Sequence, residues 1–452
     1  MKTITLDLSN VLSAAVGGNG IEENDFRLTL GLISEYYGKL LMKPYPFMTL
    51  PSTRFQFDEM QALSEKASKM NIRNLVILGI GGSSLGTQTI FDALLHPFHN
   101  LEERLRGGKP RYFILDNIDP HKMTAVLETV LPEIDRTYLV VISKSGETPE
   151  TIAQFMLFNE IMKRSGDYKD RIVLITDMEK GLLNKVAQKE GYTVLNLPPG
   201  IGGRFSVLTP VGLFPSALMG INVKKMSDGA AGMAAHIVRY DADENMAFVL
   251  AAVLYLTYKN GKPIHVMMPY CERLAAFADW FRQLEAESLG KKGQGPAPTK
   301  SVGVTDQHSQ LQLYVDGPRD KCIVLLYSSA GEVPIPDSFD YLEDVAYLAN
   351  KDMKDLFRAE FQGTHLSLTE SGTPNISLTL DEVSDYNLGA LFYLFEMVIT
   401  FMGHLMSVNA FDQPGVEQGK IYTKAMMGKK GLEKEREHTD EFLSRPPRQV
   451  VF

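Results

Sequence analysis

Cysteine is scarce in this sequence, with Cys271 and Cys322 the two present among 452 residues. Each lies in or beside an apolar segment, and neither belongs to a CxxC pair. This pattern argues against a disulfide framework and indicates a reducing compartment. The opening residues, MKTITLDLSN, contain no apolar core of signal-peptide length, so we expect a cytoplasmic protein that is not exported.

Long hydrophobic runs are also rare. One stretch, residues 388–406, approaches the length needed to span a bilayer, but it carries Glu396 and His404 and stands alone. Because a charged side chain is costly in lipid, this stretch is predicted to be a helix buried inside the protein. We therefore expect no membrane partner.

Composition and charge narrow the class of protein. Hydrophobic residues make up 44% of the chain and charged residues 22%, which is typical of a globular protein and argues against a disordered or fibrous one. The net charge of −9 argues against a nucleic-acid partner, so any phosphate must be bound by local donors. No His/Cys cluster has the spacing of metal ligands, and no metal or other cofactor is expected.

Short β-branched runs begin at Asn74 and alternate with longer stretches of helical spacing. This alternation predicts α/β domains, each an αβα sandwich whose parallel sheet carries crossover helices on both faces. A chain of this length exceeds one ordinary core, so two such domains are expected. Residues 291–303 read as a polar loop within the second. The expected boundaries are 1–50 for an N-terminal helical arm, 51–199 and 200–424 for the two α/β domains, and 425–452 for a C-terminal tail.

A glycine-rich turn, residues 79–86, follows the first of these strands directly. Its glycines allow backbone N–H groups to approach a ligand, and Ser83 and Ser84 add hydroxyls. The turn is not a dinucleotide fingerprint, which would need glycine at position 84, and no GK[ST] follows as in a Walker loop. Tight packing of the turn explains these glycines equally well.

A second turn, SKSGETPET, supplies Ser143, Lys144, Ser145 and Thr148 directly after another strand. Thr148 and Pro149 form a good N-cap and first-turn pair, so a helix N-terminus points its free N–H groups into the same loop. These donors suit a phosphate dianion. An ordinary Ser/Thr-rich cap is the alternative, but ligands of open α/β sheets bind at the carboxyl ends of strands, where both turns lie.

Four residues further along the chain are candidates for chemistry: Arg204, Glu287, His308 and Lys420. A carboxylate can take and return a proton, and a guanidinium can stabilise a negatively charged intermediate. A histidine and a lysine are suitable types for an acid and a base. Taken singly, each has an ordinary explanation, namely a structural ion pair, a solvated carboxylate, a structural histidine and a solvated lysine.

Six segments together resemble the phosphoglucose isomerase family in order and approximate spacing, namely LGIGGSSLG, SKSGETPET, GGRFSVLTPVG, AESLGK, TDQHS and FDQPGVEQGK. The resemblance runs from Asn74 to Lys420 and is closest to the shorter bacterial form. GGRFS and the last segment are highly specific to the family, whereas the first two occur more widely in phosphosugar-binding sugar isomerase (SIS) domains. The resemblance implies two SIS domains and a homodimer or higher oligomer with a shared active site.

The activity that this resemblance implies is the interconversion of D-glucose 6-phosphate and D-fructose 6-phosphate, in glycolysis and gluconeogenesis. Glu287 matches the base that moves a proton between C2 and C1 through a cis-enediol. Arg204 matches the arginine that stabilises the enediolate and keeps the glutamate ionised. His308 matches the ring-opening histidine, supplied by the partner subunit, and Lys420 matches the lysine at the ring oxygen. The implied substrate-binding residues are Gly82, Ser83, Ser143, Lys144, Ser145, Thr148, Gln283 and Gln413.

Three alternatives stay open. His365 is a rival for the role of His308, although it ranks below it by motif. Mannose 6-phosphate is a conceivable second substrate, but dual-specificity enzymes usually lack an FDQPGVE-type segment. A non-catalytic phosphosugar sensor would need no base and normally carries a DNA-binding module, and this acidic chain shows no basic helix-turn-helix segment.

Overall fold

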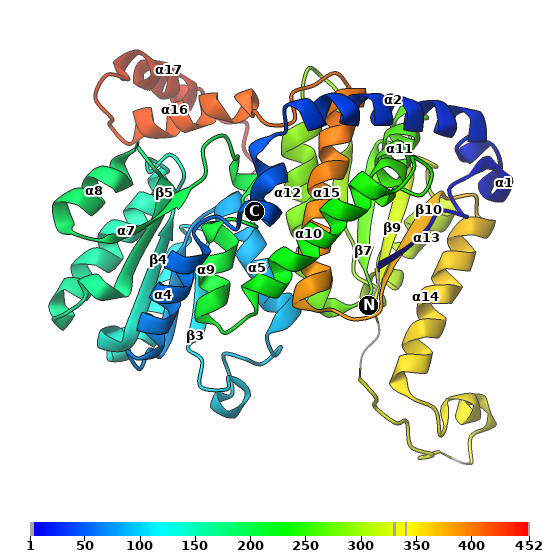
Figure 1. Cartoon of the computed structure of the whole chain (residues 1–452), viewed down its shortest axis with the longest axis horizontal. Helices are drawn as coiled ribbons and strands as arrows, with labels where there is room; N and C mark the ends of the chain where they lie inside the picture. Colours follow the sequence, from blue (N-terminus) through cyan, green and yellow to red (C-terminus); the bar gives the residue numbers. More distant parts are fainter. Residues whose placement is uncertain (1–3, 180, 329–330, 340, 451–452) are drawn as a thin grey trace. The chain divides into compact units, whose positions relative to one another are not determined.

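The computed structural model of the protein describes residues 4–179, 181–328, 331–339 and 341–450. The chain forms two compact units, residues 1–410 and residues 411–452. The larger unit contains two five-stranded sheets, each flanked by helices (Figure 1). The smaller unit contains two of the helices described below.

The first sheet is parallel throughout and has the order β3-β2-β4-β5-β6. Its strands are β2 (Asn74–Leu78), β3 (Arg111–Leu115), β4 (Thr137–Ile142), β5 (Ile172–Asp177) and β6 (Thr193–Leu197). They coincide with the short β-branched runs that begin at Asn74, and β2 and β4 are buried along their whole length. Burial of both faces explains why these runs are continuously apolar instead of alternating.

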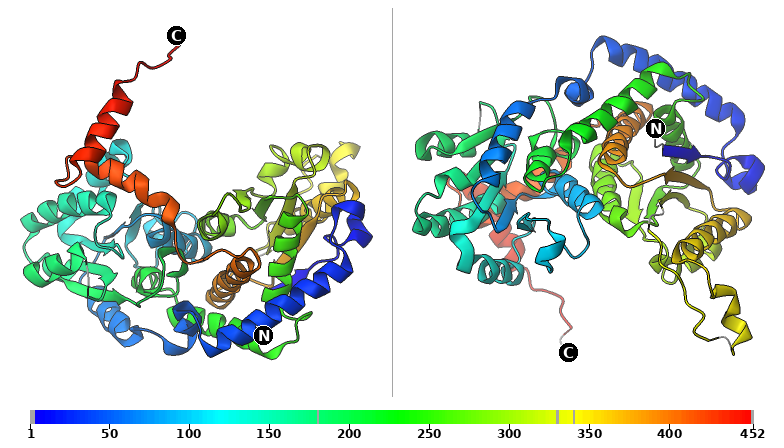
Figure 2. Two further views of the ribbon diagram at one scale, coloured as in Figure 1. Left: turned by 90° about the horizontal axis from the view of Figure 1, so that it is seen from above. Right: turned by 60° about the horizontal axis from the view of Figure 1, so that its bottom comes forward.

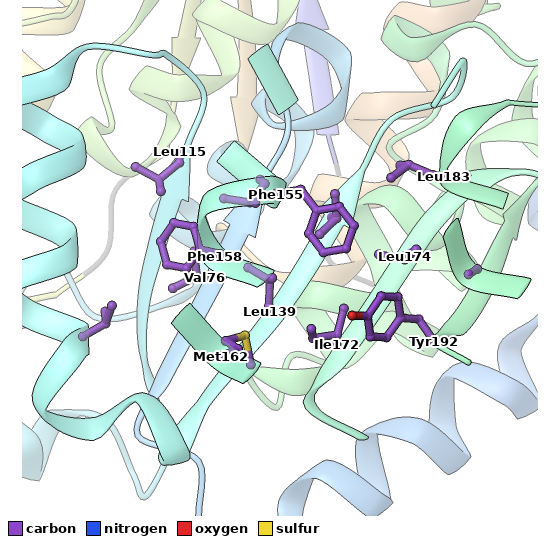
Figure 3. Packing of buried hydrophobic residues seen from close by; sticks show 14 of the residues in the cluster. Val76, Leu115, Leu139, Phe155, Phe158, Met162, Ile172, Leu174, Leu183 and Tyr192 are labelled. Atoms are coloured by element: carbon purple, nitrogen blue, oxygen red, sulfur yellow. The ribbon is translucent and has the colours of Figure 1, made fainter. Parts of the chain in front are cut away.

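Helices cover the first sheet and complete its core. They are α4 (Phe57–Ser68), α5 (Leu85–Leu94), α6 (Pro120–Val130), α7 (Pro149–Met162), α8 (Leu182–Glu190) and α9 (Pro210–Leu218). Phe155, Phe158 and Met162 of α7 pack against Leu139 and Leu174 of the neighbouring strands, as Figure 3 shows. Because these side chains are almost fully buried, the hydrophobic effect fixes α7 over β4 and β5.

The second sheet has the order β1-β10-β9-β7-β8. Its strands are β1 (Ile4–Asp7), β7 (Ile264–Pro269), β8 (Ala297–Lys300), β9 (Lys321–Tyr327) and β10 (Asn375–Leu380). β7, β8, β9 and β10 run parallel, whereas β1 pairs antiparallel with β10. The expectation of parallel sheets and of a helical N-terminal arm therefore holds except for β1, a strand too short for its alternation to be recognised in the sequence.

The edge strand β8 lies in the segment predicted to be a polar loop. It contains Pro298, which is tolerated at a sheet edge because its missing N–H group costs no central hydrogen bond. Its four residues, with the sequence APTK, carry too little apolar signal to predict a strand, so pairing with β7 determines this element.

The helices around the second sheet include one that is apolar nearly throughout. They are α10 (Val223–Arg239), α11 (Met246–Lys259), α12 (Ala275–Leu289), α13 (Leu311–Asp316), α14 (Met353–Glu370) and α15 (Asp385–Leu405). By length and composition α15 could cross a membrane, but 89% of its most apolar window is buried within the protein. The prediction of a buried helix is confirmed, since α15 packs against α10, α11 and α12.

The N-terminal residues continue from β1 into α1 (Ser13–Val16), α2 (Glu23–Met42) and α3 (Leu50–Thr53). The long helix α2 lies alongside α11 and α15 (Figure 2). In the smaller unit, α16 (Glu417–Met426) and α17 (Glu433–Ser444) pack against each other. This unit begins at Phe411, within the FDQPGVEQGK segment.

Candidate active site

The two glycine- and serine-rich turns begin side by side at the carboxyl ends of β2 and β4. These strands are neighbours in the sheet, and Leu78, the last residue of β2, pairs with Val141 near the end of β4. The chain leaves β2 toward β3 on one side and later returns to β4 on the other. The turns therefore meet at the topological switch point of the sheet, where ligands of α/β proteins bind.

The first turn is closed by a contact with the GGRFS segment. Gly81–Ser83 forms a 3-10 turn, and Gly203–Phe205 forms another that packs against it. A Cβ atom on Gly82 would lie 2.2 Å from the carbonyl carbon of Gly203, so only glycine fits at this position. Tight packing therefore requires glycine at position 82, and the packing brings Arg204 next to the turn.

The second turn is held by its own hydroxyl groups. The hydroxyls of Ser143 and Thr148 lie 3.0 Å apart, and the backbone N–H of Glu147 donates to Ser145 Oγ over 3.2 Å. Thr148 occupies the N-cap position of α7, as predicted, but its side chain makes no capping hydrogen bond. Its hydroxyl instead faces Ser143, which leaves the first turn of α7 without a side-chain acceptor.

Arg204 and Glu287 form an ion pair at the centre of the larger unit. Arg204 Nη1 lies 3.2 Å from Glu287 Oε1, and 2% of the arginine side chain and 26% of the glutamate side chain are exposed. The guanidinium also donates to Ser288 Oγ over 2.7 Å and to the carbonyl oxygen of Ala410 over 2.5 Å. The arginine is thus fixed by several acceptors, whereas the carboxylate stays accessible.

Gln283 completes the environment of this carboxylate. Its Nε2 donates to Glu287 Oε2 over 3.0 Å, one helical turn along α12. A Cβ atom on Gly81 would lie 2.9 Å from the same Nε2, so Gln283 also lies against the first turn. Each oxygen of Glu287 therefore faces one donor, and the residues come from both α/β parts of the larger unit.

The contacts of Ser288 and Ala410 were not predicted from the sequence. Ser288 is fully buried and receives a hydrogen bond from Arg204, while Ala410 contributes a backbone carbonyl. Ser288 stands beside Glu287 in the AESLGK segment, which is the only sequence signal for its place. No residue-type pattern could have identified a carbonyl oxygen supplied from more than two hundred residues away.

The predicted histidine, His308, is at the surface of the described part of the protein. His308 follows the 3-10 turn Thr305–Gln307, and it is exposed. It makes no hydrogen bond or ion pair with Arg204 or Glu287 among the described residues. The rival histidine, His365, is turned toward the N-terminal segment, where its Nε2 lies 2.7 Å from Asn10 Nδ2.

Lys420 and Gln413 belong to the smaller unit. Lys420 Nζ lies 2.8 Å from Glu417 Oε1, one turn earlier on α16, and both side chains are about half exposed. Gln413 precedes the 3-10 turn Pro414–Val416. The exposed pair leaves the ammonium of Lys420 within reach of solvent.

A cavity of about 600 Å³ opens at the carboxyl ends of β7 and β9. Tyr270, Val304, Ser328 and Phe357 are among the residues that line it, and no predicted site residue is among them. Across the described part of the chain, no group of three or more His, Cys, Asp or Glu side chains is arranged to hold a metal ion. The candidate site is therefore the Arg204–Glu287–Gln283 cluster beside the first turn.

The chain is similar in sequence to proteins of known function. A family model described as phosphoglucose isomerase matches residues 57–309 and 351–442. A glucose-6-phosphate isomerase from Rubrobacter xylanophilus is 40% identical over 439 residues, which are 95% of this chain and 99% of that protein. One from Carboxydothermus hydrogenoformans is 40% identical over 384 residues, 82% of each chain.

Solved structures share the fold. A hypothetical protein from Thermus thermophilus superposes with a TM-score of 0.82 at 31% identity, over 94% of this chain and 100% of that one. A glucose-6-phosphate isomerase from Chlamydia trachomatis superposes with a TM-score of 0.77 at 21% identity, over 95% of this chain and 91% of that one.

Proposed function

The chain belongs to the phosphoglucose isomerase family, and on that basis we propose that it interconverts D-glucose 6-phosphate and D-fructose 6-phosphate. The observation that carries the proposal is the Arg204–Glu287 pair, in which a buried guanidinium faces an accessible carboxylate. A general base must be reachable by its substrate, and the charge that develops on the substrate needs a fixed cation nearby. This pair offers both.

The phosphate is bound by the two turns at the carboxyl ends of β2 and β4. Ser143, Lys144, Ser145 and Thr148 provide the side chains, and the N-terminus of α7 adds backbone N–H groups. Gly82 and Ser83 complete the site from the first turn. Because the phosphate is remote from the reacting carbons, its binding orients the sugar without taking part in the proton transfer.

Glu287 removes the proton from C2 of the open-chain aldose, and O1 is protonated, which gives a cis-enediol. The same carboxylic acid then returns a proton to C1 while O2 loses its proton and becomes the ketose carbonyl. Solvent supplies the proton that O1 takes up and accepts the one that O2 releases, so the oxygen protons balance. Arg204 stabilises the negative charge on the enediolate oxygens, and its guanidinium lies beside the Glu287 carboxylate. Gln283 orients the second carboxylate oxygen and contacts the sugar together with Gln413.

Ring opening is assigned to His308 of a second copy of the chain and to Lys420. His308 is exposed and makes no hydrogen bond or ion pair with Glu287 among the described residues, which supports a role in a neighbour's site. The protein is accordingly proposed to be a homodimer or a higher homo-oligomer in the cytoplasm. Lys420 supplies an ammonium at the ring oxygen.

A coupled assay tests the proposal directly. Purified protein with fructose 6-phosphate, glucose-6-phosphate dehydrogenase and NADP should generate NADPH, and a chelator should leave the rate unchanged because no metal is required. Mannose 6-phosphate, supplied in parallel with its own coupling enzymes, should be turned over far more slowly. Tight binding of fructose 6-phosphate without any turnover would contradict the proposal and favour a phosphosugar sensor.

A further inference from the structure

A buried ionisable pair lies directly behind the candidate site. His265 is on β7 and Glu285 is on α12, and neither side chain has any exposed surface. His265 Nδ1 lies 2.7 Å from Glu285 Oε1. A pair of this kind is expensive to desolvate, and apolar residues of similar volume often give equal or greater stability, so burial alone does not explain it.

The geometry of α12 suggests what the pair does. Successive residues of an α-helix turn by about 100°, so Glu285 and Glu287 point to opposite sides of α12. Glu285 faces the sheet at β7, whereas Gln283, Glu287 and Ser288 face Arg204 and the first turn. Any rotation of the last turns of α12 that moves Glu285 would therefore move Glu287 as well.

The remaining contacts behind this part of α12 are mostly apolar. Phe277, Phe281 and Leu284 are fully buried, and apolar contacts are non-directional, so they resist small rotations of a helix weakly. A short hydrogen bond between a carboxylate and an imidazole is directional and stronger than one between neutral groups. On the sheet side of α12, the pair therefore adds a directional constraint on the rotation of the helix about its own axis to the constraint that the packing provides.

We propose that the His265–Glu285 pair is a positioning clamp that holds Glu287 in register with Arg204 and the bound sugar. The inference rests on the proposed function, in which Glu287 is the base. A base must lie within hydrogen-bond reach of the proton it removes, and a displacement of about 1 Å can reduce a rate by about 100-fold. The clamp acts on the proton transfer and leaves the binding of the phosphate, held on the first sheet, unchanged.

The test is a variant that removes the hydrogen bond without leaving a buried charge. The double substitution His265→Leu with Glu285→Met replaces both partners by apolar side chains of similar size, so the protein should fold with a melting temperature near that of the wild type. We expect kcat to fall by about 10- to 100-fold. KM for fructose 6-phosphate and the affinity for glucitol 6-phosphate, which cannot be isomerised, should change less than about threefold.

Two control variants are compared with the double variant. Lys300→Gln breaks another polar contact between α12 and the second sheet, the 2.6 Å ion pair of Lys300 with Asp279, which is partly exposed and lies earlier on the helix. Its kcat should stay near that of the wild type. Glu285→Gln keeps a side chain that can hydrogen-bond to His265 and should retain most of kcat.

A double variant that is as stable as the wild type and keeps its kcat would overturn the clamp. If the double variant does not fold, Glu285→Met alone removes the same hydrogen bond and allows the same comparison of kcat and KM. A wild-type protein that lacks isomerase activity would instead contradict the proposed function, so the two failures are distinguishable.

Discussion

The Glu287 carboxylate accepts contacts from two donors and is also partly exposed. Arg204 faces one carboxylate oxygen and Gln283 the other, while about a quarter of the side chain stays exposed. Two donors hold the plane of the carboxylate without burying it. A group in this arrangement can exchange a proton with a bound ligand without a large movement of the protein.

The first prediction concerns this carboxylate. Glu287→Gln keeps the size of the side chain and removes the base, so kcat should fall by about 100- to 10,000-fold while KM changes little. Steady-state kinetics with the coupled assay measure both constants, and circular dichroism checks the fold. Glu244→Gln, at an exposed glutamate, is the matched control. Near-wild-type turnover of Glu287→Gln would rule out its role as the base.

Glu396 is a second glutamate whose surroundings differ completely. It is fully buried in α15, and neither of its oxygens has a hydrogen-bond partner among the described residues. Burial raises the pKa of this carboxyl well above its usual value of 4.5. The folded protein therefore holds Glu396 in its neutral form at pH values where the unfolded chain is already ionised.

The pH dependence of stability follows from this shift. Below about pH 4.5 the Glu396 carboxyl is neutral in both the folded and the unfolded chain, so its ionisation does not lower the free energy of unfolding. As the pH rises from there toward the pKa of the folded state, the unfolded chain ionises and the free energy of unfolding falls progressively. Glu396→Gln removes that loss, so the free energy of unfolding of the variant should improve relative to the wild type as the pH rises from 4.5 to 8. The gain is at most about 1.4 kcal/mol per pH unit. Denaturant unfolding at several pH values measures it, and a difference independent of pH would contradict the prediction.

At the scale of elements, two short 3-10 turns join the α/β parts of the larger unit. Gly81–Ser83 follows β2 of the first sheet, and Gly203–Phe205 precedes α9 and carries Arg204. Their backbones are in contact, and α12 packs against both. The position of Arg204 therefore depends on how closely these two turns approach each other.

Alanine substitutions in the two turns should behave differently. In Gly82→Ala the new Cβ would lie 2.2 Å from the carbonyl carbon of Gly203, so the turns must separate. We expect a loss of stability of about 1–3 kcal/mol and a reduced kcat, because Arg204 moves with its turn. In the matched variant Gly203→Ala the nearest atom, Gly82 Cα, lies 3.8 Å away, which is an ordinary contact. Thermal unfolding and kinetics of both variants test this, and equal effects would refute the steric argument.

At the scale of the whole molecule, the two sheets share one connectivity. The order β3-β2-β4-β5-β6 in the first sheet corresponds to β8-β7-β9-β10-β1 in the second. The correspondence ends at β1, which comes from the N-terminus and runs antiparallel. No repeat is recognisable in the sequence, because the fold requires only apolar strands and amphipathic helices in the same order.

A shared active site predicts complementation between two inactive variants. Glu287→Gln and His308→Asn proteins should each be nearly inactive as homo-oligomers. In a mixed dimer, one site combines the intact Glu287 of one subunit with the intact His308 of the other. After subunit exchange or co-expression, about a quarter of the wild-type activity should return for a statistical mixture of dimers.

The same mixture shows whether the Glu287 and His308 of one active site come from one subunit or from two. If His308 acted on the Glu287 of its own subunit, every site in the mixed dimer would lack one residue and no activity would return. Sedimentation of the mixture confirms that dimers form, and separately stored variants serve as the control.

Much of the fold was predictable from local patterns. The five strands of the first sheet, and β7, β9 and β10 of the second, coincide with apolar runs, because strands buried on both faces need continuous apolar sequence. The buried helix α15 was recognisable for a similar reason. β1 and β8 were not, since each is four residues long and owes its existence to pairing with a distant strand.

The sequence by itself determined which residue types are available to the candidate site, because Glu287, Arg204 and the two turns, to which the proposed chemistry is assigned, lie in recognisable local segments. Only the tertiary structure decided that Arg204 and Glu287 form a pair, that Ser288 and the carbonyl of Ala410 hold the guanidinium, and that His265 lies behind α12. The physical reason is that these contacts join residues far apart in the chain. Their distances depend on how the sheets and helices pack, and local periodicity carries no information about that packing.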